Sequence, residues 1–354
     1  MTHLFRRSMI WSALLAAPVL IGASPTPVAP APAAPAPVSP PADASTPIDT
    51  AAEPGTASDI VPFIQPFDLD ATRRMSVKVM VGGKGPFAFL VDTGAERTVI
   101  ARELAARLGL VEGARLRMAT IGGSATVPSF LVAALQMSNL HLAAIEAPAF
   151  YGRHIGAAGL IGVDMLETRR VLIDFRKETM QVLETRRRAA PLIRDDDAII
   201  VTARNSAGRL ILSDARLNGK RIDVIVDTGA QTSVGNIALQ KMVADRRANR
   251  FPFFATELTA VTGEDVAAVR TAIKRISIDG LDVNDLPVSF ADSQAFRALG
   301  LHDRPALLLG MDSLSLFDRV EIDFPNRRVV FDLPDAAGRQ TGLRFAANGS
   351  KTGG

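Results

Sequence analysis

Cysteine is absent from the 354-residue chain. This excludes disulfides, thiol catalysis, thiolate metal sites and the acylated cysteine of a bacterial lipoprotein. Aromatic residues make up only 5% of the chain, and the formal net charge is only +3. The basic residues are scattered or form short runs such as 186–188, which are typical of a solvated surface. We therefore predict no nucleic-acid partner.

Motifs for several common catalytic sites are also missing. The four histidines show no metal-ligand spacing, and neither a Gly-x-Ser-x-Gly elbow nor a Ser-x-x-Lys motif occurs. The glycine-rich stretch at 82–85 opens a strand-like segment instead of a helix, which favours a hairpin turn over a phosphate cradle. The sequence thus predicts an activity with no cofactor and no metal.

The amino terminus has the three parts of a secretory signal. Arg6 and Arg7 precede an apolar run over residues 9–21, and Gly22 and Ala23 follow it. We predict a signal peptide over residues 1–23, with an uncleaved anchor through residues 9–23 as the alternative. The protein is then exported, either free in the periplasm or held at the inner membrane facing it. Residues 24–57, rich in Pro and Ala, predict a disordered linker.

A domain-length internal repeat is the most informative feature. Val-Asp-Thr-Gly-Ala occurs at 91–95 and again at 226–230, each copy after a glycine-lysine turn and an apolar strand-like run. Helix-like segments follow at 101–108 and 237–243. Two occurrences with matching surroundings indicate duplication of a whole lobe.

A second motif recurs in the same order in both halves. Leu-Ile-Gly at 160–162 matches Leu-Leu-Gly at 308–310, and strand-like segments follow at 171–175 and 320–324. We predict an all-β fold with short helices, built from two pseudo-symmetric lobes. The predicted boundaries are 58–188 for lobe 1, 189–196 for the linker, 197–335 for lobe 2 and 336–354 for a tail.

Together these motifs resemble the retropepsin-like (clan AA) aspartic peptidases, with two lobes fused in one chain, over about residues 58–335. The resemblance implies an active site between the lobes, with Asp92 and Asp227 as catalytic residues. It also implies a set of residues that support this dyad: Thr93 and Thr228, which bond across it; Gly94 and Gly229 in the same loops; and Gly162 and Gly310, which brace the loops. The chain has Val163 and Met311 where viral members have an arginine, so the bracing must differ locally.

Two aspartates suit peptide hydrolysis because adjacent carboxylates cannot both ionise easily and share one proton. One partner then acts as a base toward water, while the other acts as an acid toward the carbonyl oxygen and the leaving amine. Pepsin-like relatives place a serine donor after the glycine, whereas this chain has Ala95 and Ala230. We therefore expect optimal activity in mildly acid to near-neutral solution instead of strong acid.

Two turns between strand-like segments are candidates for substrate flaps. Ile121, Gly122 and Gly123 form the first, and Thr262 and Gly263 the second; plain surface turns are the alternative for both. Asp164 and Asp312, which repeat beside the apolar-apolar-Gly motif, are predicted to cap short helices.

The predicted function is that of an aspartic endopeptidase acting on peptide or protein substrates as a monomer. Two alternatives remain open at this point. The first is a catalytically silent peptide-binding module of the same fold, and the second is pairing of lobes between chains. The short link between the lobes favours pairing within one chain.

Overall fold

The computed structural model describes residues 64–66, 68–69, 74–137, 140–142, 144–195, 198–206, 208–245, 251–334 and 345–347. The predicted signal peptide and Pro/Ala-rich linker lie outside these residues. Within them the chain is mostly β with short helices, which confirms the predicted fold class. None of the described helices combines the length and apolar character that a membrane crossing requires.

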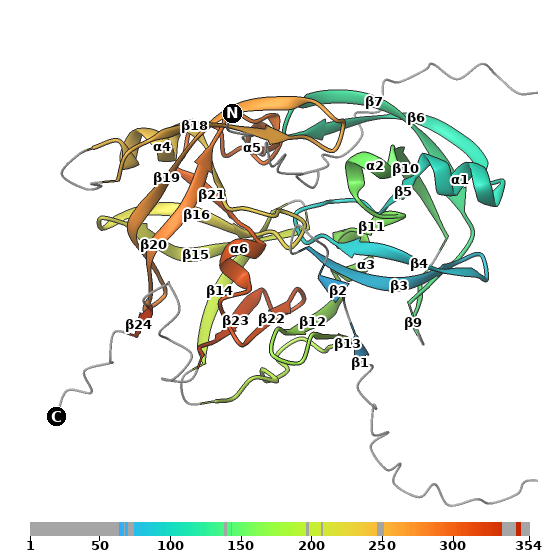
Figure 1. The fold of residues 1–354 in the computed structure, drawn as a ribbon. Coiled ribbons are helices and arrows are strands. Elements are labelled where there is room, and N and C mark those ends of the chain that lie inside the picture. Colours follow the sequence, from blue (N-terminus) through green and yellow to red (C-terminus); the bar gives the residue numbers. More distant parts are fainter. Residues whose placement is uncertain are drawn as a thin grey trace, which may run out of the picture. The chain divides into compact units, whose positions relative to one another are not determined.

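One sheet of ten strands is built from the first repeat (Figure 1). Its order is β6 (Val111–Thr120), β7 (Gly123–Val132), β10 (Ile145–Phe150), β5 (Val99–Ala101), β11 (Gly159–Ile161), β4 (Lys84–Val91), β3 (Met75–Val81), β8 (Leu135–Met137) and β9 (Leu140–Leu142), with β2 (Asp68–Leu69) on β3. The motif strand β4 lies between β3 and β11, so the first Asp-Thr-Gly loop leaves the interior of this sheet.

A second sheet of fourteen strands combines the second repeat with the last two strands of the first and with the short strand that precedes it. Its order is β1 (Ile64–Pro66), β13 (Thr179–Glu184), β12 (Arg169–Asp174), β22 (Arg319–Asp323), β23 (Arg328–Asp332), β14 (Ile199–Ser206), β15 (Arg209–Leu217), β16 (Lys220–Val226), β21 (Ala306–Leu309), β17 (Val234–Gly235), β20 (Leu281–Phe290), β19 (Asp265–Ile278) and β18 (Phe254–Thr259), with β24 (Phe345–Ala347) on β20. The motif strand β16 lies between β15 and β21.

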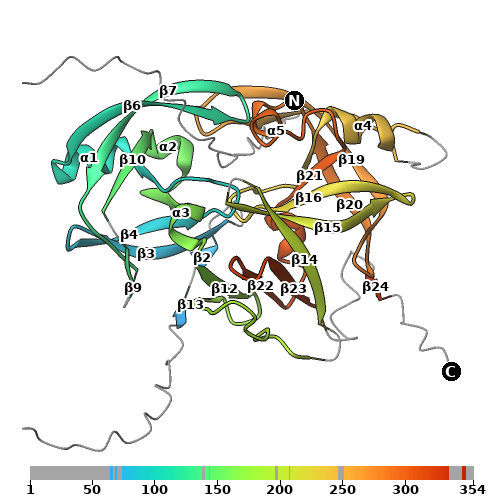
Figure 2. The ribbon, with the colours of Figure 1, turned by 180° about the vertical axis from the view of Figure 1, so that it is seen from behind.

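The two repeats are joined through their closing strands, as the labels β12 and β22 show in Figures 1 and 2. These strands pair antiparallel, with Val171 opposite Ile322. Beside them Arg170 forms a buried ion pair with Asp323 at 2.7 Å, so a charge from each repeat is satisfied by the other. The hydrogen bonds of this ladder and the buried pair fix the relation of the two halves.

The described helices are short and lie beside the motif loops. They are α1 (Arg102–Leu108), α2 (Gly152–Ile155), α3 (Val163–Leu166), α4 (Ile237–Val243), α5 (Gln294–Ala298) and α6 (Met311–Leu314). Helix α1 ends at Gly109, whose φ of 65° is in the left-handed region that glycine adopts readily. Helices α1 and α4 occupy the helix-like segments expected after each Asp-Thr-Gly.

The prediction that Asp164 and Asp312 cap helices is wrong. Gly162 and Gly310 occupy the N-cap positions of α3 and α6, and neither helix has a side-chain cap. The two carboxylates lie two residues further inside, where they accept hydrogen bonds from a neighbouring loop instead.

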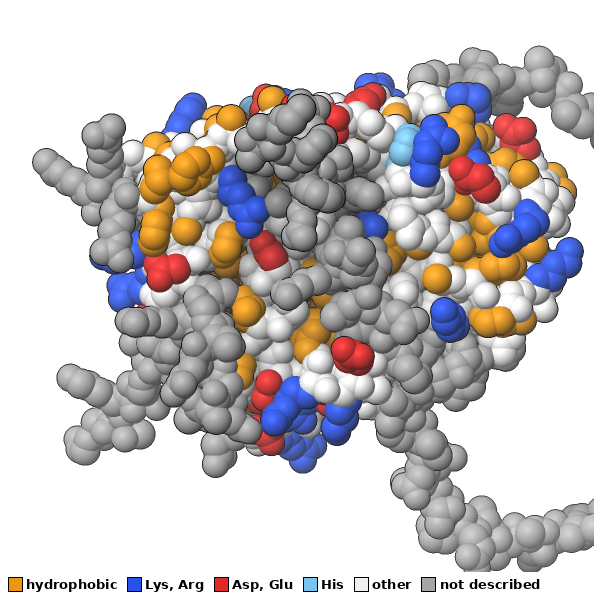
Figure 3. Space-filling model, viewed as in Figure 1, with side chains coloured by type: hydrophobic (Ala, Val, Ile, Leu, Met, Phe, Trp, Pro, Cys, Tyr) orange, Lys and Arg blue, Asp and Glu red, His pale blue; other side chains and the backbone are white. Residues whose placement is uncertain are grey.

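Side chains along the motif strand β16 alternate between its two faces, and each face packs in a different apolar layer. Val224 and Val226 of β16 belong to the larger core, while Ile225 between them belongs to a second cluster with Ile211 and Leu308. Buried on both faces, β16 holds its carboxyl end rigidly. On the face drawn in Figure 3, acidic and basic side chains are interspersed among apolar ones.

Candidate active site

Each motif aspartate directly follows a strand in a sheet interior. The backbone N–H of Asp92 donates to the carbonyl of Ile161 at 2.9 Å, and that of Asp227 donates to Leu309 at 3.0 Å. Both acceptors lie on strands that run parallel to the motif strand, β11 beside β4 and β21 beside β16. The same local arrangement therefore delivers one buried aspartate from each repeat.

Backbone amides hold one oxygen of each carboxylate. Gly94 and Ala95 donate to Oδ1 of Asp92 at 2.9 and 2.8 Å. Gly229 and Ala230 donate to Oδ1 of Asp227 at 3.0 and 3.1 Å. The loops thus fix the orientation of both carboxyl groups, and they do so without a side-chain donor at the two alanines.

The threonines link the two loops, as the resemblance implied. The hydroxyl of Thr93 donates to the carbonyl of Val226 at 2.9 Å, and that of Thr228 donates to Val91 at 2.8 Å. Each hydroxyl also accepts the backbone N–H of the other threonine at 3.1 Å. These four bonds couple residues 133 to 137 positions apart, so the two repeats meet within one chain.

The glycines allow the two loops to approach closely. A Cβ at Gly94 would collide with the carboxyl group of Asp227, and one at Gly229 would collide with that of Asp92. The two carboxyl groups are themselves hydrogen-bonded to each other. Any larger residue at either glycine would separate the aspartates.

Burial governs the ionisation of the pair. It raises the pKa of Asp92 well above its ordinary value, and the negative charge of Asp227 raises it further. Burial also raises the pKa of Asp227, to about 6, where the amides of Ala230 and Gly229 limit the rise. Asp227 is therefore the group that ionises first, while Asp92 retains the proton. The Oδ2 atom of Asp92 has no partner among the described protein groups, although it is buried.

Gly162 and Gly310 brace the loops from behind. A Cβ at Gly310 would lie 2.7 Å from the carbonyl carbon of Thr232, so only glycine allows this contact. The next residues complete the brace, because Val163 donates its N–H to Ala95 and Met311 donates to Ala230, both at 2.8 Å.

Acidic side chains contribute to the bracing in this chain, which lacks the arginine of viral relatives. Asp164 accepts the backbone N–H of Thr98 at 2.9 Å and its hydroxyl at 2.8 Å. Asp312 accepts the corresponding groups of Ser233 at 3.0 and 2.8 Å. Their repetition in the sequence thus reflects a structural role in each lobe.

Arg209 is a component of the site that the sequence reasoning missed. Its side chain is 1% exposed, and its Nε donates to the carbonyl of Gly94 at 2.7 Å from the opposite lobe. Its charge lowers the pKa of Asp227 and faces Glu96 at 3.8 Å. Arg74 occupies the equivalent place before Asp92 and is also buried. This repeated arginine was a signal available in the sequence.

The predicted flaps are hairpin tips that meet each other. Strands β6 and β7 turn at Ile121 and Gly122, and β18 and β19 turn at 260–264 (Figures 1 and 2). Ile121 is buried in an apolar cluster with Ala260 of the other hairpin. A Cβ at Gly122 would lie 2.8 Å from the Glu264 carboxylate. The tips are therefore closed over each other.

The remaining flap residues lie on the same turns. Gly123 begins β7, and Thr262 and Gly263 lie in the second turn. Gly263 packs directly against the ring of His154 in helix α2 of the first lobe. This histidine contact was not predicted. No metal-binding group of three or more acidic or histidine residues occurs in the part of the chain that the structure describes.

Two β lobes that each bring one buried aspartate to a shared, hydrogen-bonded pair define an aspartic peptidase fold. The aspartyl protease family model matches residues 77–165 and 213–313, one match for each repeat and together more than half of the chain. The chain belongs to this family, and the predicted resemblance to retropepsin-like peptidases is confirmed. No curated protein matches the chain.

Proposed function

We propose that the protein is an aspartic endopeptidase in which Asp92 and Asp227 share one proton and activate water. The observation that carries this proposal is the buried carboxyl pair, in which the pKa of both groups is raised and Asp92 holds its proton more tightly. A single state of the enzyme then contains both the base and the acid that peptide hydrolysis needs.

In the proposed reaction, the Asp227 carboxylate takes a proton from a water molecule held between the two groups. The water oxygen bonds to the peptide carbonyl carbon, and the Asp92 carboxyl group donates its proton to the carbonyl oxygen. As the carbon–nitrogen bond breaks, a proton passes from the dyad to the departing amine. Each step uses a carboxyl group already oriented by backbone amides.

The hairpins supply substrate access. Their tips contact each other through Ile121 and Ala260, so a polypeptide can reach the dyad only after they separate. Closure over the bound chain then excludes water and holds the scissile bond in place. We also retain the proposals that the protein is exported to the periplasm, free or anchored through residues 9–23, and that it acts as a monomer.

The proposed mechanism has a definite pH dependence. Asp227 must be ionised, and its pKa is about 6, so kcat/KM should rise as the pH increases through this value. It should fall again once Asp92 loses its proton. We expect an optimum in mildly acid to near-neutral solution, and peak turnover near pH 2 to 3 would exclude this ionisation scheme.

The test compares cleavage of a mixed peptide library by the full-length chain and by its Asp92→Asn and Asp227→Asn variants. Asn keeps the oxygen that accepts the two loop amides but cannot exchange a proton, so each variant should lose roughly a thousandfold or more of kcat. Asp285→Asn, at an exposed position in β20, is the matched control and should retain full activity.

Circular dichroism of all four proteins establishes that they are folded. If wild type and control cleave while both dyad variants are inactive, the proposal stands. If the folded wild type binds peptides but cleaves none at any pH, the silent peptide-binding module replaces it.

A further inference from the structure

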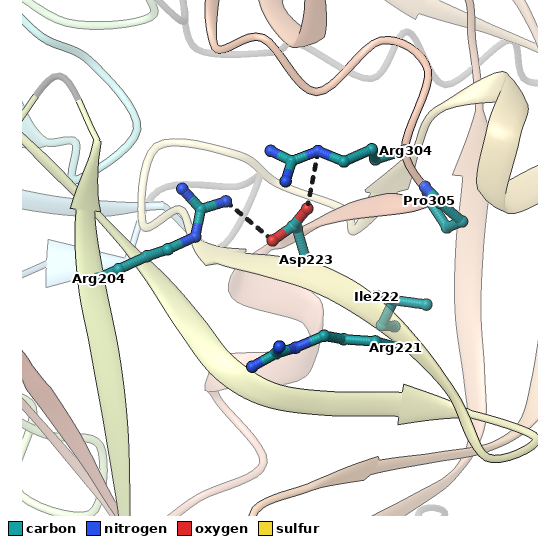
Figure 4. Close-up of a pocket in the computed structure, with 6 residues that line it drawn as sticks. All are labelled: Arg204, Arg221, Ile222, Asp223, Arg304 and Pro305. Atoms are coloured by element: carbon teal, nitrogen blue, oxygen red, sulfur yellow. Dashed lines mark hydrogen bonds and ion pairs between the residues drawn. The ribbon is translucent and has the colours of Figure 1, made fainter.

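A pocket of about 380 Å³ lies in the second lobe, away from the dyad itself. Figure 4 shows its lining: Arg204, Arg221, Ile222, Asp223, Arg304 and Pro305. Three guanidinium groups and a single carboxylate line this space. Arg204 and Arg304 share that carboxylate, and these two guanidinium groups are the feature that calls for a ligand.

The carboxylate of the pocket does not neutralise it. Asp223 accepts a hydrogen bond from Arg204 at 2.9 Å, but its distance to Arg304 is 3.7 Å, beyond hydrogen-bond length. The side chains of Arg204 and Arg304 are 43% and 56% exposed, so their terminal N–H groups remain accessible. Guanidinium groups bind carboxylates through two parallel hydrogen bonds, which makes an anionic group the natural ligand.

The pocket shares a sheet face with the catalytic residue. Side chains alternate along a strand, so Arg221, Asp223 and Ile225 project to the same side of β16, and Asp227 directly follows the last residue of this strand. At about 3.3 Å per residue, the Cα atoms of Asp223 and Asp227 are roughly 13 Å apart. An extended peptide covers that distance with about four residues.

The neighbouring strands place Arg204 on this face too. Arg204 is paired with Ile211, and Ile211 is paired with Ile225, so the three side chains lie side by side. Ile211 and Ile225 are fully buried in the apolar cluster that Ile121 of the first hairpin also joins. A peptide can therefore lie over them only after this hairpin lifts.

The first lobe has no equivalent of this pocket. The positions that match Arg221 and Asp223 in the first repeat are Pro86 and Ala88. Arg304 precedes Gly310 by as many residues as Gly156 precedes Gly162. Because the first lobe forms the same strands without these charges, the fold does not require them. The charges therefore distinguish one end of the cleft from the other.

We propose that this arginine pocket binds a carboxylate of the peptide substrate about four residues from the cleaved bond, on one side of that bond only. The proposal rests on the proposed peptidase function and adds a substrate class to it. The carboxylate can belong to an Asp or Glu side chain or to the carboxyl terminus of a peptide, since both present the same two oxygens.

The test uses pairs of peptides built on one sequence that the enzyme cleaves, with Glu or Gln at each position three to five residues on either side of the cut. A further pair ends in a free carboxylate or an amide, which separates the two carboxylate sources. We expect kcat/KM to be roughly five- to tenfold higher for one carboxylate peptide than for its neutral partner, as for a charge-assisted hydrogen bond. This preference should occur on one side of the cleaved bond only. Arg304→Gln and Arg221→Gln should abolish this preference by lowering kcat/KM for the carboxylate peptide to the value for its Gln or amide partner.

The matched control is Arg275→Gln on β19, which removes the same charge from an arginine that lies outside the pocket lining. Equal cleavage of both members of every pair, or a preference that survives both pocket variants, would overturn the arginine pocket while the peptidase function stands.

Peptide pairs of the same design, built on a sequence that binds the Asp227→Asn chain, are also titrated against this chain by fluorescence anisotropy. If one carboxylate peptide binds more tightly than its neutral partner and Arg304→Gln removes this difference, the pocket is supported. That result holds even if the wild type cleaves nothing, in which case only the peptidase function fails. Equal binding of all pairs contradicts the pocket without reference to catalysis.

Discussion

At the scale of single residues, the two aspartates of the dyad are buried for their function, and this burial opposes the stability of the folded protein. Asp92 and Asp227 are almost fully buried, and backbone amides donate to one oxygen of each carboxyl group. Placing an ionisable pair in such a site disfavours the charged form. The native state therefore binds a proton that the unfolded chain releases at lower pH.

This opposition predicts how stability depends on pH. The pKa of Asp227 is about 6 in the folded protein, above the ordinary value of 3.8. Proton binding by Asp227 therefore adds to the free energy of unfolding in acid, and this contribution is lost as the pH rises through about 6. A shift of this size corresponds to about 3 kcal/mol. We expect the wild type to lose about that much unfolding free energy, relative to Asp227→Asn, between pH 4 and pH 8.

Denaturant unfolding of both proteins at a series of pH values measures the difference. Asp285→Asn, at an exposed site, should follow the wild type closely. If the difference in unfolding free energy between the wild type and Asp227→Asn stays constant across this range, the carboxyl group at 227 has an ordinary pKa.

The residues of the site differ in how far the sequence revealed them. Asp92 and Asp227 belong to a repeated pentapeptide, so both were identified by position alone. Arg209 repeats Arg74 of the first half, but its contact with Gly94 arises only because β15 of one lobe passes the loop of the other. Its role depends on the pairing of the lobes, which a single repeat cannot specify.

At the scale of elements, the hairpins are the parts that must move. The first tip is held by Ile121, which is 2% exposed and packs with residues of the second lobe. The rest of the hairpin is anchored by the ladder between β6 and β7. The tip can therefore separate from its neighbour while the base stays paired.

Ile121→Ala should loosen the tip without unfolding the lobe. Removing a buried isoleucine side chain costs a few kcal/mol of contact, so amide exchange over residues 118–124 should become roughly tenfold or more faster. Exchange at the tip of the other hairpin, at 260–264, should also become faster, and KM should rise. Hydrogen–deuterium exchange with mass spectrometry measures exchange at both tips, and steady-state kinetics measures KM.

Leu131→Ala provides the control, because Leu131 lies in the same hairpin but is 50% exposed and distant from the tip along β7. It should leave exchange at both tips unchanged. If Ile121→Ala also leaves the second tip unchanged, the two hairpins are not coupled by their contact.

Strands and helices near the motifs were predictable, because hydrophobic patterns and glycines mark them locally. The function of Asp164 and Asp312 was not predictable in this way, because an aspartate before apolar residues suggests a helix cap. The structure directs both carboxylates to Thr98 and Ser233 instead, in loops more than sixty positions away in the sequence.

At the scale of the whole molecule, one chain supplies both halves of the site. The threonine bonds join residues 135 positions apart, and β12 pairs with β22 of the other repeat. Glu321, buried in β22, also accepts the backbone amides of Leu192 and Ile193 in the segment between the repeats. Pairing within the chain thus supplies hydrogen-bond partners to buried groups at the junction.

We therefore expect the active species to be a monomer of at most 37.6 kDa. Sedimentation velocity should give this mass, and specific activity should stay constant on serial dilution, because tethered lobes do not dissociate. Activity that falls with dilution, together with a larger mass at high concentration, would show that lobes pair between chains.

The duplication, the all-β lobes, the family and the positions of the two aspartates can all be read from the sequence, because each of these leaves a local, repeated pattern. The lobe boundaries and the export signal stay predictions. The strands that join the repeats, the contact between the hairpin tips and the arginines that gather on the second lobe become visible only in three dimensions. These features depend on contacts between segments far apart in the chain, where neither periodicity nor a motif records the partner.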